Sequence, residues 1–179
     1  QASKLGGGRI DEVKLKESLN KELQKKLGDA NAILQIKEMN FYLDPKIQGK
    51  KNVAEELKKL LLATEGVGYA FSAADYADGK LPPGILKKQI LNSYFPGRSG
   101  EVVAILKPYW LSGVEGTDHQ TGYSYDRIVP LLIAGKNITP GVYSTHAEIV
   151  DVVPTLSFLL GTLPPSQMHG RVLSEIVGK

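Results

Sequence analysis

The sequence contains no cysteine and no long apolar run. Without cysteine, the chain cannot form a disulfide, a Cys-ligated zinc site, an iron–sulfur cluster or a cysteine nucleophile. No stretch approaches the roughly 18 consecutive apolar residues of a transmembrane helix, so we expect no membrane span. The 22 basic and 19 acidic residues leave a formal net charge of +3, which is too small to indicate a nucleic-acid partner.

The composition is that of a globular protein. The chain has 179 residues, of which 42% are hydrophobic and 23% charged, and this balance excludes wholesale disorder. The length suits about one domain, so we expect residues 1–179 to form a single domain or a fragment of a larger one. The chain begins at Gln1, and residues 1–8 lack the apolar segment of a signal peptide. We therefore expect a processed product or a piece of a longer chain.

Hydrophobic periodicity predicts helices and strands in irregular alternation. The clearest helix covers Ile10–Leu27, where leucine recurs at every fourth position, with Asp11 as its N-cap and Gly28 at its end. Further helices are expected at Asn52–Glu65, capped by Asn52, at Leu81–Asn92, and at Asp151–Leu160, capped by Asp151. Strands are expected within Asn31–Asp44 and at Val67–Ala74, Glu101–Trp110 and Val129–Ala134, the last buried on both faces. This order indicates an α/β or α+β arrangement.

Known short motifs do not reveal a catalytic centre. The sequence has no HExxH, no GxSxG, no Walker loop and no GxGxxG after a strand. None of its three histidines has a second His or a carboxylate at a metal-ligand spacing. These patterns therefore assign no catalytic residue and no cofactor-binding residue.

The most informative segment is a polar loop that leads into the apolar run at residues 129–134. Residues 116–132 read GTDHQTGYSYDRIVPLL, with His119 in a glycine-flanked stretch. Loops beside strand ends are where ligands and catalytic groups gather in open α/β sheets. An imidazole there is a candidate metal ligand, general base or capping group, and an ordinary surface histidine is the alternative.

Several segments together resemble the C-terminal signature of the alkaline phosphatase superfamily, closest to the bacterial phosphatases related to type I phosphodiesterases and nucleotide pyrophosphatases. That signature is similar to GT-x-HG-[ST]-P-Y-x-YD-x-x-VPLL, matched here at residues 116–132 without a gap. Residues 135–141, GKNITPG, and 151–161, DVVPTLSFLLG, follow in the family's order. Residues 40–44 and 98–102 resemble upstream blocks of the same family.

The resemblance implies a fold, a metal and a reaction. The expected fold is the C-terminal portion of an alkaline-phosphatase-like α/β/α sandwich with a small antiparallel sheet. The family's GTxH histidine is a zinc ligand, and His119 matches it, so His119 is the one expected metal ligand of this chain. Two zinc ions about 4 Å apart clamp the attacking and leaving oxygens in phosphoryl transfer. A periplasmic or secreted location is also implied.

The chain departs from the family pattern next to His119. The family's glycine after the histidine is Gln120 here, and its proline is Gly122. A bulky amide at Gln120 would alter or inactivate the metal site. Asp118 matches a variable family position, so a solvated or turn-forming role is favoured over a ligand role. Tyr123 and Tyr125 are candidates either for a substrate pocket or for partial burial.

Other candidates receive structural interpretations. Thr145, His146 and His169 match no functional family position and are read as surface residues. Arg98 is read as part of a turn before a strand, with a phosphate contact as the alternative.

The family's Thr or Ser nucleophile and most of its zinc ligands match nothing in this chain. The leading hypothesis is therefore a C-terminal fragment of a zinc phosphatase or phosphodiesterase that hydrolyses phosphate esters. Its partner would be the N-terminal part of the parent, and the fragment alone would be inactive. The alternative is a non-catalytic binding or assembly module derived from the same fold.

Overall fold

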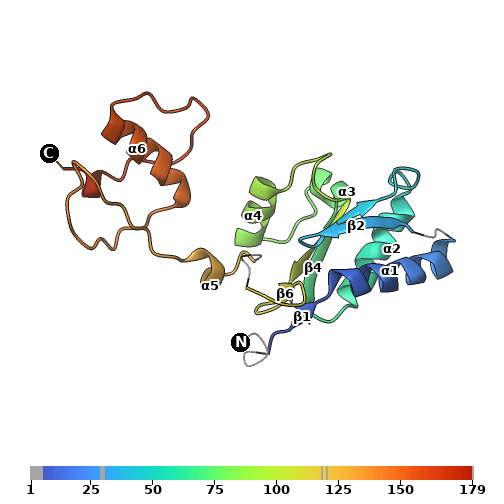
Figure 1. Ribbon diagram of the computed structural model, residues 1–179. Coiled ribbons are helices and arrows are strands. Elements are labelled where there is room, and N and C mark those ends of the chain that lie inside the picture. Colours follow the sequence, from blue (N-terminus) through green and yellow to red (C-terminus); the bar gives the residue numbers. More distant parts are fainter. Residues whose placement is uncertain (1–5, 29–30, 118, 120, 179) are drawn as a thin grey trace. The chain divides into compact units, whose positions relative to one another are not determined.

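The computed structural model describes residues 6–28, 31–117, 119 and 121–178, and only the backbone of Lys51. The chain divides into two compact units, which we call unit 1 (Gln1–Ile128) and unit 2 (Val129–Lys179). Figure 1 shows their elements, and each unit is described by itself below. The expectation of a single domain or fragment stays a prediction. In the described part of the chain, no helix has the length and apolar character that a membrane crossing requires.

Unit 1 is built around a four-stranded antiparallel sheet with the strand order β2-β3-β5-β4. These strands are β2 (Ile33–Lys37), β3 (Asn40–Leu43), β4 (Val67–Ser72) and β5 (Val102–Leu106). The central strand β5 alternates its side chains between the two faces, with Val102, Ala104 and Leu106 buried on one of them. Val103 and Ile105 lie on the other face and are also apolar, so both faces of β5 pack against other parts of unit 1.

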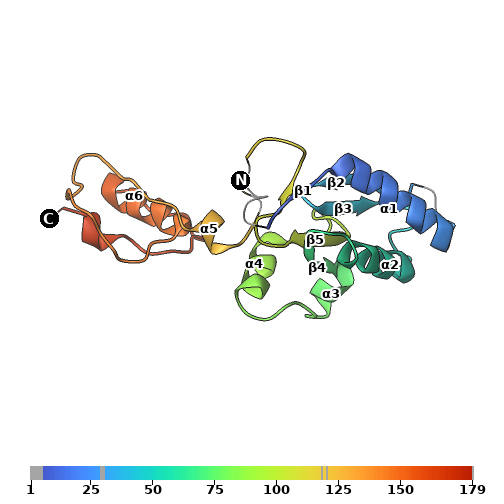
Figure 2. The same cartoon turned by 90° about the horizontal axis from the view of Figure 1, so that it is seen from below.

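Two helices, α1 (Glu12–Leu27) and α2 (Lys51–Leu62), cover one face of the sheet (Figures 1 and 2). The leucine stripe of α1 faces this core, where Leu19 and Leu23 are buried. Asp11 caps α1 as predicted, since its carboxylate accepts the N–H groups of Val13 and Lys14. The core also contains, from α2 and the strands, Val53, Leu57, Leu61, Ile33, Phe41 and Leu43.

A smaller cluster covers the opposite face of β4 and β5. Ile90 of α4 (Ile85–Ser93) and Tyr94 pack with Phe71 of β4. Partly buried Val103 and Ile105 of β5 join this cluster. The short helix α3 (Ala73–Ala77) follows β4 and begins with a capping box between Ser72 and Asp75. The resulting order of helix, sheet and helix agrees with the predicted layering.

A short parallel pair completes unit 1. β1 (Arg9–Ile10) pairs with β6 (Leu111–Ser112) and joins the start of the unit to the segment after β5. Gly66 has φ +89°, and a Cβ there would lie 2.1 Å from the Trp110 ring. Only glycine fits this close approach at a left-handed backbone position.

Unit 2 is mostly irregular. Its elements are the 3₁₀ turns η2 (Ile149–Asp151) and η3 (Ser174–Ile176) and the helix α6 (Val152–Leu160). An isolated bridge joins Ile138 to Val177. Polar groups are central to it, because Asp151 and Thr155 are among its few buried residues.

Three local predictions were wrong. Residues 129–134 form no strand and are largely exposed, because no described segment of the chain supplies a neighbouring strand for them. Helix α2 begins at Lys51 and not after Asn52, with no side-chain cap. Asp151 occupies the predicted N-cap position of α6, but the predicted side-chain cap is absent, because its carboxylate accepts the N–H groups of Glu148 and Arg171, at 2.8 Å each.

Candidate functional site

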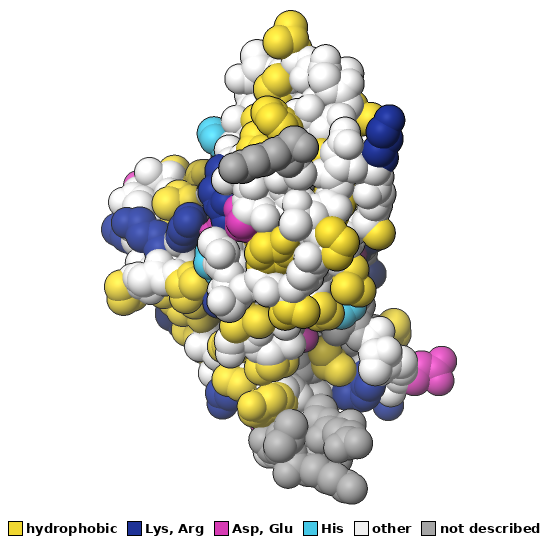
Figure 3. Space-filling view, turned by 90° about the vertical axis from the view of Figure 1, so that its left-hand side faces the viewer, with side chains coloured by type: hydrophobic (Ala, Val, Ile, Leu, Met, Phe, Trp, Pro, Cys, Tyr) yellow, Lys and Arg dark blue, Asp and Glu magenta, His cyan; other side chains and the backbone are white. Residues whose placement is uncertain are grey.

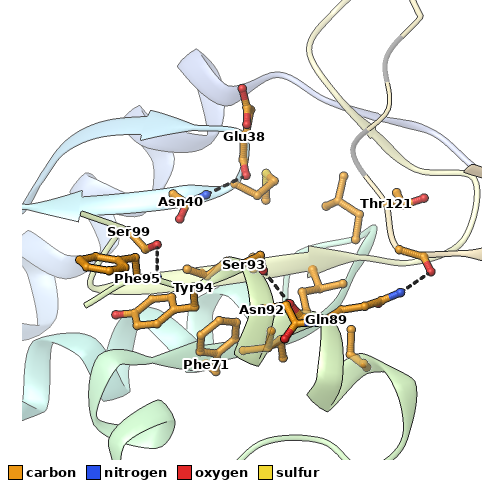
Figure 4. Close-up of a pocket in the computed structure, with 18 of the residues that line it drawn as sticks. Glu38, Asn40, Phe71, Gln89, Asn92, Ser93, Tyr94, Phe95, Ser99 and Thr121 are labelled. Atoms are coloured by element: carbon orange, nitrogen blue, oxygen red, sulfur yellow. Dashed lines mark hydrogen bonds between the residues drawn. The ribbon is translucent and has the colours of Figure 1, made fainter. Parts of the chain in front are cut away.

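Unit 1 contains a pocket of about 940 Å³ that includes His119 in its lining. The pocket lies over the face of the sheet that α4 leaves partly open (Figure 4). Its volume lies within the range of small-molecule sites, about 300–1,000 Å³. The predicted metal ligand therefore borders a cavity that is large enough for an organic ligand.

The floor and the rim of the pocket differ in character. We call its apolar lining the floor, which includes Phe71, Leu86, Ile90, Val103, Ile105 and Leu106. The rim is polar, with Asn40 and Ser99 toward one end and Thr121 toward the other (Figure 4). An apolar cavity with a few polar groups at its edge is typical of a small-molecule site.

The loop after His119 is fastened to the rest of unit 1 at several points. Gln89 of α4 donates a hydrogen bond to the carbonyl of Gly122, at 2.9 Å. Thr121 donates its backbone N–H to the Asp126 carboxylate, at 3.2 Å, and its hydroxyl donates to the same carboxylate. Asp126 belongs to α5 (Ser124–Arg127), a short helix that overlaps the end of the segment predicted as a loop, residues 113–125. These contacts hold the loop against α4.

Two tyrosines fasten the same segment to the end of β5. The Tyr123 hydroxyl donates to the carbonyl of Leu106, at 2.8 Å, and burial raises the pKa of that hydroxyl. The Tyr125 hydroxyl accepts the backbone N–H of Tyr109, at 2.8 Å, and the two rings stack with centroids 4.7 Å apart. Neither Tyr123 nor Tyr125 lines the pocket; Tyr123 is partly buried, whereas Tyr125 is 43% exposed.

Gly122 shows how one departure from the family pattern is accommodated. A Cβ at this position would lie 2.1 Å from the Gln89 side-chain oxygen. The proline of the family pattern would therefore displace the Gln89 side chain, which now reaches the carbonyl of Gly122. The other departure, Gln120, and the neighbouring Asp118 lie outside the described residues.

His119 alone does not make a zinc site. It is exposed on the pocket rim. Among the described residues, no group of three or more His, Cys, Asp or Glu side chains is arranged to hold a metal ion. Protein zinc sites use three or four protein ligands. The described residues therefore do not fit a complete zinc centre, and any such centre needs ligands from elsewhere.

The remaining candidates take the places expected of them. The His146 side chain is exposed and lies 3.6 Å from a carboxylate oxygen of Glu148, and His169 is exposed. Arg98 lies in the turn between α4 and β5, with its guanidinium over the Phe95 ring. Arg98 also lines the pocket, as do Gln89 and Arg127, which the sequence analysis did not single out. Gln89 had no signal in the sequence, whereas Arg127 follows His119 within the recognised motif.

Comparisons with known proteins place the chain in a family. It is 30% identical over 186 residues to alkaline phosphatase PafA of Elizabethkingia meningoseptica, covering 100% of this chain and 34% of that protein. It is 28% identical over 178 residues to a protein of Myroides odoratus named calcium-transporting ATPase, covering 95% of this chain and 32% of that protein. The crystal structure of wild-type PafA matches 96% of the chain and 34% of its own length, with a TM-score of 0.84 and 28% identity. No protein-family model matches the sequence.

The chain corresponds to a region of the alkaline phosphatase superfamily. Within it, the chain is similar to a region of PafA, and its mixed α/β fold with small sheets matches a portion of the PafA fold. The family resemblance and the fold class expected from the sequence are thereby confirmed. The chain spans about a third of the length of the curated relatives described here.

Proposed function

We propose that this chain is the C-terminal part of a zinc-dependent phosphatase or phosphodiesterase that hydrolyses phosphate esters through a Thr or Ser nucleophile outside the chain. The similarity to PafA along the whole chain, in sequence and in fold, carries this proposal. The chain alone is inactive under it, because it lacks both the nucleophile and the other zinc ligands. The N-terminal part of the parent protein is its partner.

His119 is the residue that this chain would contribute to the zinc site. A neutral imidazole is a good zinc ligand, and His119 occupies the histidine position of the GTxH pattern. The fastened loop that follows it supports a positioning role, because a ligand must be held within a few tenths of an ångström of its metal. The phosphate ester would approach from the side of the pocket that His119 borders.

The surface of unit 2 supports the idea of a larger parent. Helix α6 is rich in apolar residues, yet Phe158 is 60% exposed and Leu160 is 74% exposed. Hydrophobic side chains are spread over the face seen in Figure 3. Exposed apolar side chains that gather on one helix are typical of an interaction surface. In the proposed parent, the N-terminal part covers it.

A chimera tests the proposal. In the chimera, this chain replaces the region of PafA that aligns with it. Two quantities are measured: the rates of hydrolysis of 4-nitrophenyl phosphate and bis(4-nitrophenyl) phosphate, and the amount of zinc bound to the protein. We expect zinc-dependent hydrolysis that EDTA abolishes. The ratio of the two rates separates a monoesterase from a diesterase.

Two histidine variants give the matched comparison. His119→Ala is expected to lower kcat/KM by more than about 100-fold and to release zinc, because even loss of a residue that only orients a ligand costs about 10–100-fold. His146→Ala removes an exposed imidazole of unit 2 and is expected to change neither. Equal activity of the two variants would refute the role of His119.

The non-catalytic alternative makes a different prediction. A binding or assembly module would leave a folded chimera without zinc-dependent hydrolysis. The coding DNA upstream of Gln1 gives an independent test, since the enzyme proposal requires an in-frame Thr or Ser nucleophile, an Asp-x-x-x-His and an Asp-His there. The periplasmic or secreted location stays part of the proposal, and fractionation of cells that make the parent protein tests it.

A further inference from the structure

The lining of the pocket in unit 1 includes two arginines, Arg98 and Arg127. Arg98 borders it beside Phe95 and Ser99, and Arg127 borders it in the segment of His119 and Thr121. In Figure 4, Phe95 and Ser99 lie at one side of the pocket and Thr121 at the other. Two arginine residues from separate segments of the chain, one before β5 and one in α5, therefore line the same pocket.

Neither arginine is held in an ion pair within the described part of the chain. Glu38 is the one acidic residue in the described lining of the pocket. The carbonyl of Arg98 accepts the Tyr42 hydroxyl at 3.3 Å, which helps to place this residue at the rim. Both arginines are thus available to an anionic ligand.

An apolar floor connects the two ends. Phe71 and Ile90 are buried there, and the Phe71 and Tyr94 rings meet edge to face with centroids 5.4 Å apart. Val103 and Ile105 of β5 continue the floor. A flat aromatic group would cover such a surface at little cost in conformational entropy.

We propose that the pocket binds a phosphate ester whose organic part is aromatic and carries a second negative charge. The inference rests on the proposed function, which puts the phosphate at the end with His119 and Arg127. The aromatic ring lies on the floor, and the second anion meets Arg98. Guanidinium groups suit both phosphate and carboxylate, because they donate in the bidentate geometry that these anions accept.

Binding to the chain itself tests the inference. The methyl-labelled chain is titrated by NMR with 4-(phosphonooxy)benzoate, phenyl phosphate or inorganic phosphate. We expect 4-(phosphonooxy)benzoate to bind about tenfold more tightly than phenyl phosphate, as one charge-assisted hydrogen-bonded contact allows. Shifts should concentrate at the methyl groups of Ile90, Val103 and Ile105. Inorganic phosphate should leave those methyl groups unchanged.

Two variants test the roles of Arg98 and of the floor in ligand binding, and a third is the control. Arg98→Gln is expected to abolish the tenfold preference and to leave the binding of phenyl phosphate unchanged. Lys87→Gln removes the same charge from the exposed face of α4, outside the pocket lining, and should keep the preference. Val103→Thr replaces a floor methyl by a hydroxyl of similar size and should weaken both aryl ligands equally. Backbone spectra of each variant verify its fold.

Several results would overturn the inference. These are equal affinity for the two aryl phosphates, a preference that Lys87→Gln removes as fully as Arg98→Gln, or shifts that spare the floor. The proposed function is judged separately by zinc-dependent hydrolysis in the chimera. A chimera that hydrolyses 4-nitrophenyl phosphate, together with a chain that shows no preference for the second anion, refutes the ligand class alone.

Discussion

The two units of this chain are held together by different forces. Unit 1 buries a continuous set of aliphatic and aromatic side chains between its sheet and its helices, with Phe41, Leu23 and Leu57 fully enclosed. In unit 2, Leu173 is the buried hydrophobic residue of the described range, and it is accompanied by Pro154 and by the polar Asp151 and Thr155. Unit 1 therefore resembles an ordinary domain interior, whereas the centre of unit 2 is a hydrogen-bonded network.

The network of unit 2 is local and specific. Thr155 donates its hydroxyl to the carbonyl of Asp151, at 2.6 Å, and accepts the N–H of Leu173, at 3.0 Å. Each hydrogen bond adds only about 0.5–1.5 kcal/mol of net stability, whereas burial of a large apolar side chain adds about 1.5–3 kcal/mol. Unit 2 therefore gains less stability than unit 1 from hydrophobic burial within the chain, and its hydrogen bonds carry a larger share.

The largest expected effect comes from truncating the same residue type in each unit. Phe41→Ala is expected to lower the free energy of unfolding of unit 1 by about 3–5 kcal/mol, because the ring is fully buried. Phe158→Ala, at a ring that is 60% exposed on α6, should change the stability of unit 2 by less than about 1 kcal/mol. Amide hydrogen exchange read residue by residue separates the units. Equal losses of unfolding free energy in the two variants would contradict the proposed difference between the two units.

A second experiment tests the polar centre of unit 2. Thr155→Val keeps the side-chain shape but leaves the buried N–H of Leu173 without an acceptor, which we expect to cost about 1–3 kcal/mol. Ser157→Ala on the same helix is the control, and it should change stability by less than about 0.5 kcal/mol. Hydrogen exchange in α6 measures both. If Thr155→Val left exchange in α6 unchanged, the network would not be what holds unit 2 together.

Local sequence patterns predicted the structure of unit 1 better than that of unit 2. Predictions in unit 1 succeeded where a local pattern had its partner within the chain, as in the leucine stripe of α1 and its cap at Asp11. The prediction for residues 129–134 failed, because an apolar run becomes a strand only when neighbouring strands accept its backbone hydrogen bonds. Asp151 was assigned to a cap, although its carboxylate joins segments that are distant in the sequence.

The candidate site was predictable only in part. The recognised motif singled out His119, and the structure puts it on the rim of a pocket. The floor of that pocket comes from β4, α4 and β5, whose apolar residues look like any core residues in the sequence. Gln89 reaches the His119 segment only through tertiary structure. A single sequence therefore predicted the ligand candidate but not its surroundings.

Acid is expected to weaken unit 2 through named carboxylates. Hydrogen bonds from the Arg171 guanidinium, at 2.9 and 3.0 Å, lower the pKa of Glu175 from an ordinary 4.5 to about 2. The N–H groups of Glu148 and then Arg171 lower the pKa of Asp151 below its ordinary 3.8. A depressed carboxylate pKa stabilises the folded state above the unfolded pKa, and that stabilisation is lost as the pH falls through the folded value.

The expected loss in unit 2 therefore falls between about pH 4.5 and 2. Glu175→Gln should flatten the pH dependence of α6 hydrogen exchange in this window. Glu22→Gln, which removes a carboxylate of unit 1 whose pKa is lowered by Lys25, should leave α6 as it was. A wild-type α6 that shows the same protection at pH 2.5 and pH 6 would contradict this prediction.

The smallest effect on stability is expected at the exposed apolar surface, and it sharpens the comparison most directly. Leu132 is 90% exposed, so Leu132→Ser should change the free energy of unfolding by less than about 0.5 kcal/mol. The same change should reduce binding of a hydrophobic dye and self-association at high concentration, because it removes part of an uncovered apolar surface. Leu34→Ser in β2, at a half-exposed position of unit 1, is the control and should affect dye binding less. A large loss of stability from Leu132→Ser would mean that this residue packs within the chain, and the surface of unit 2 would then need no outside partner there.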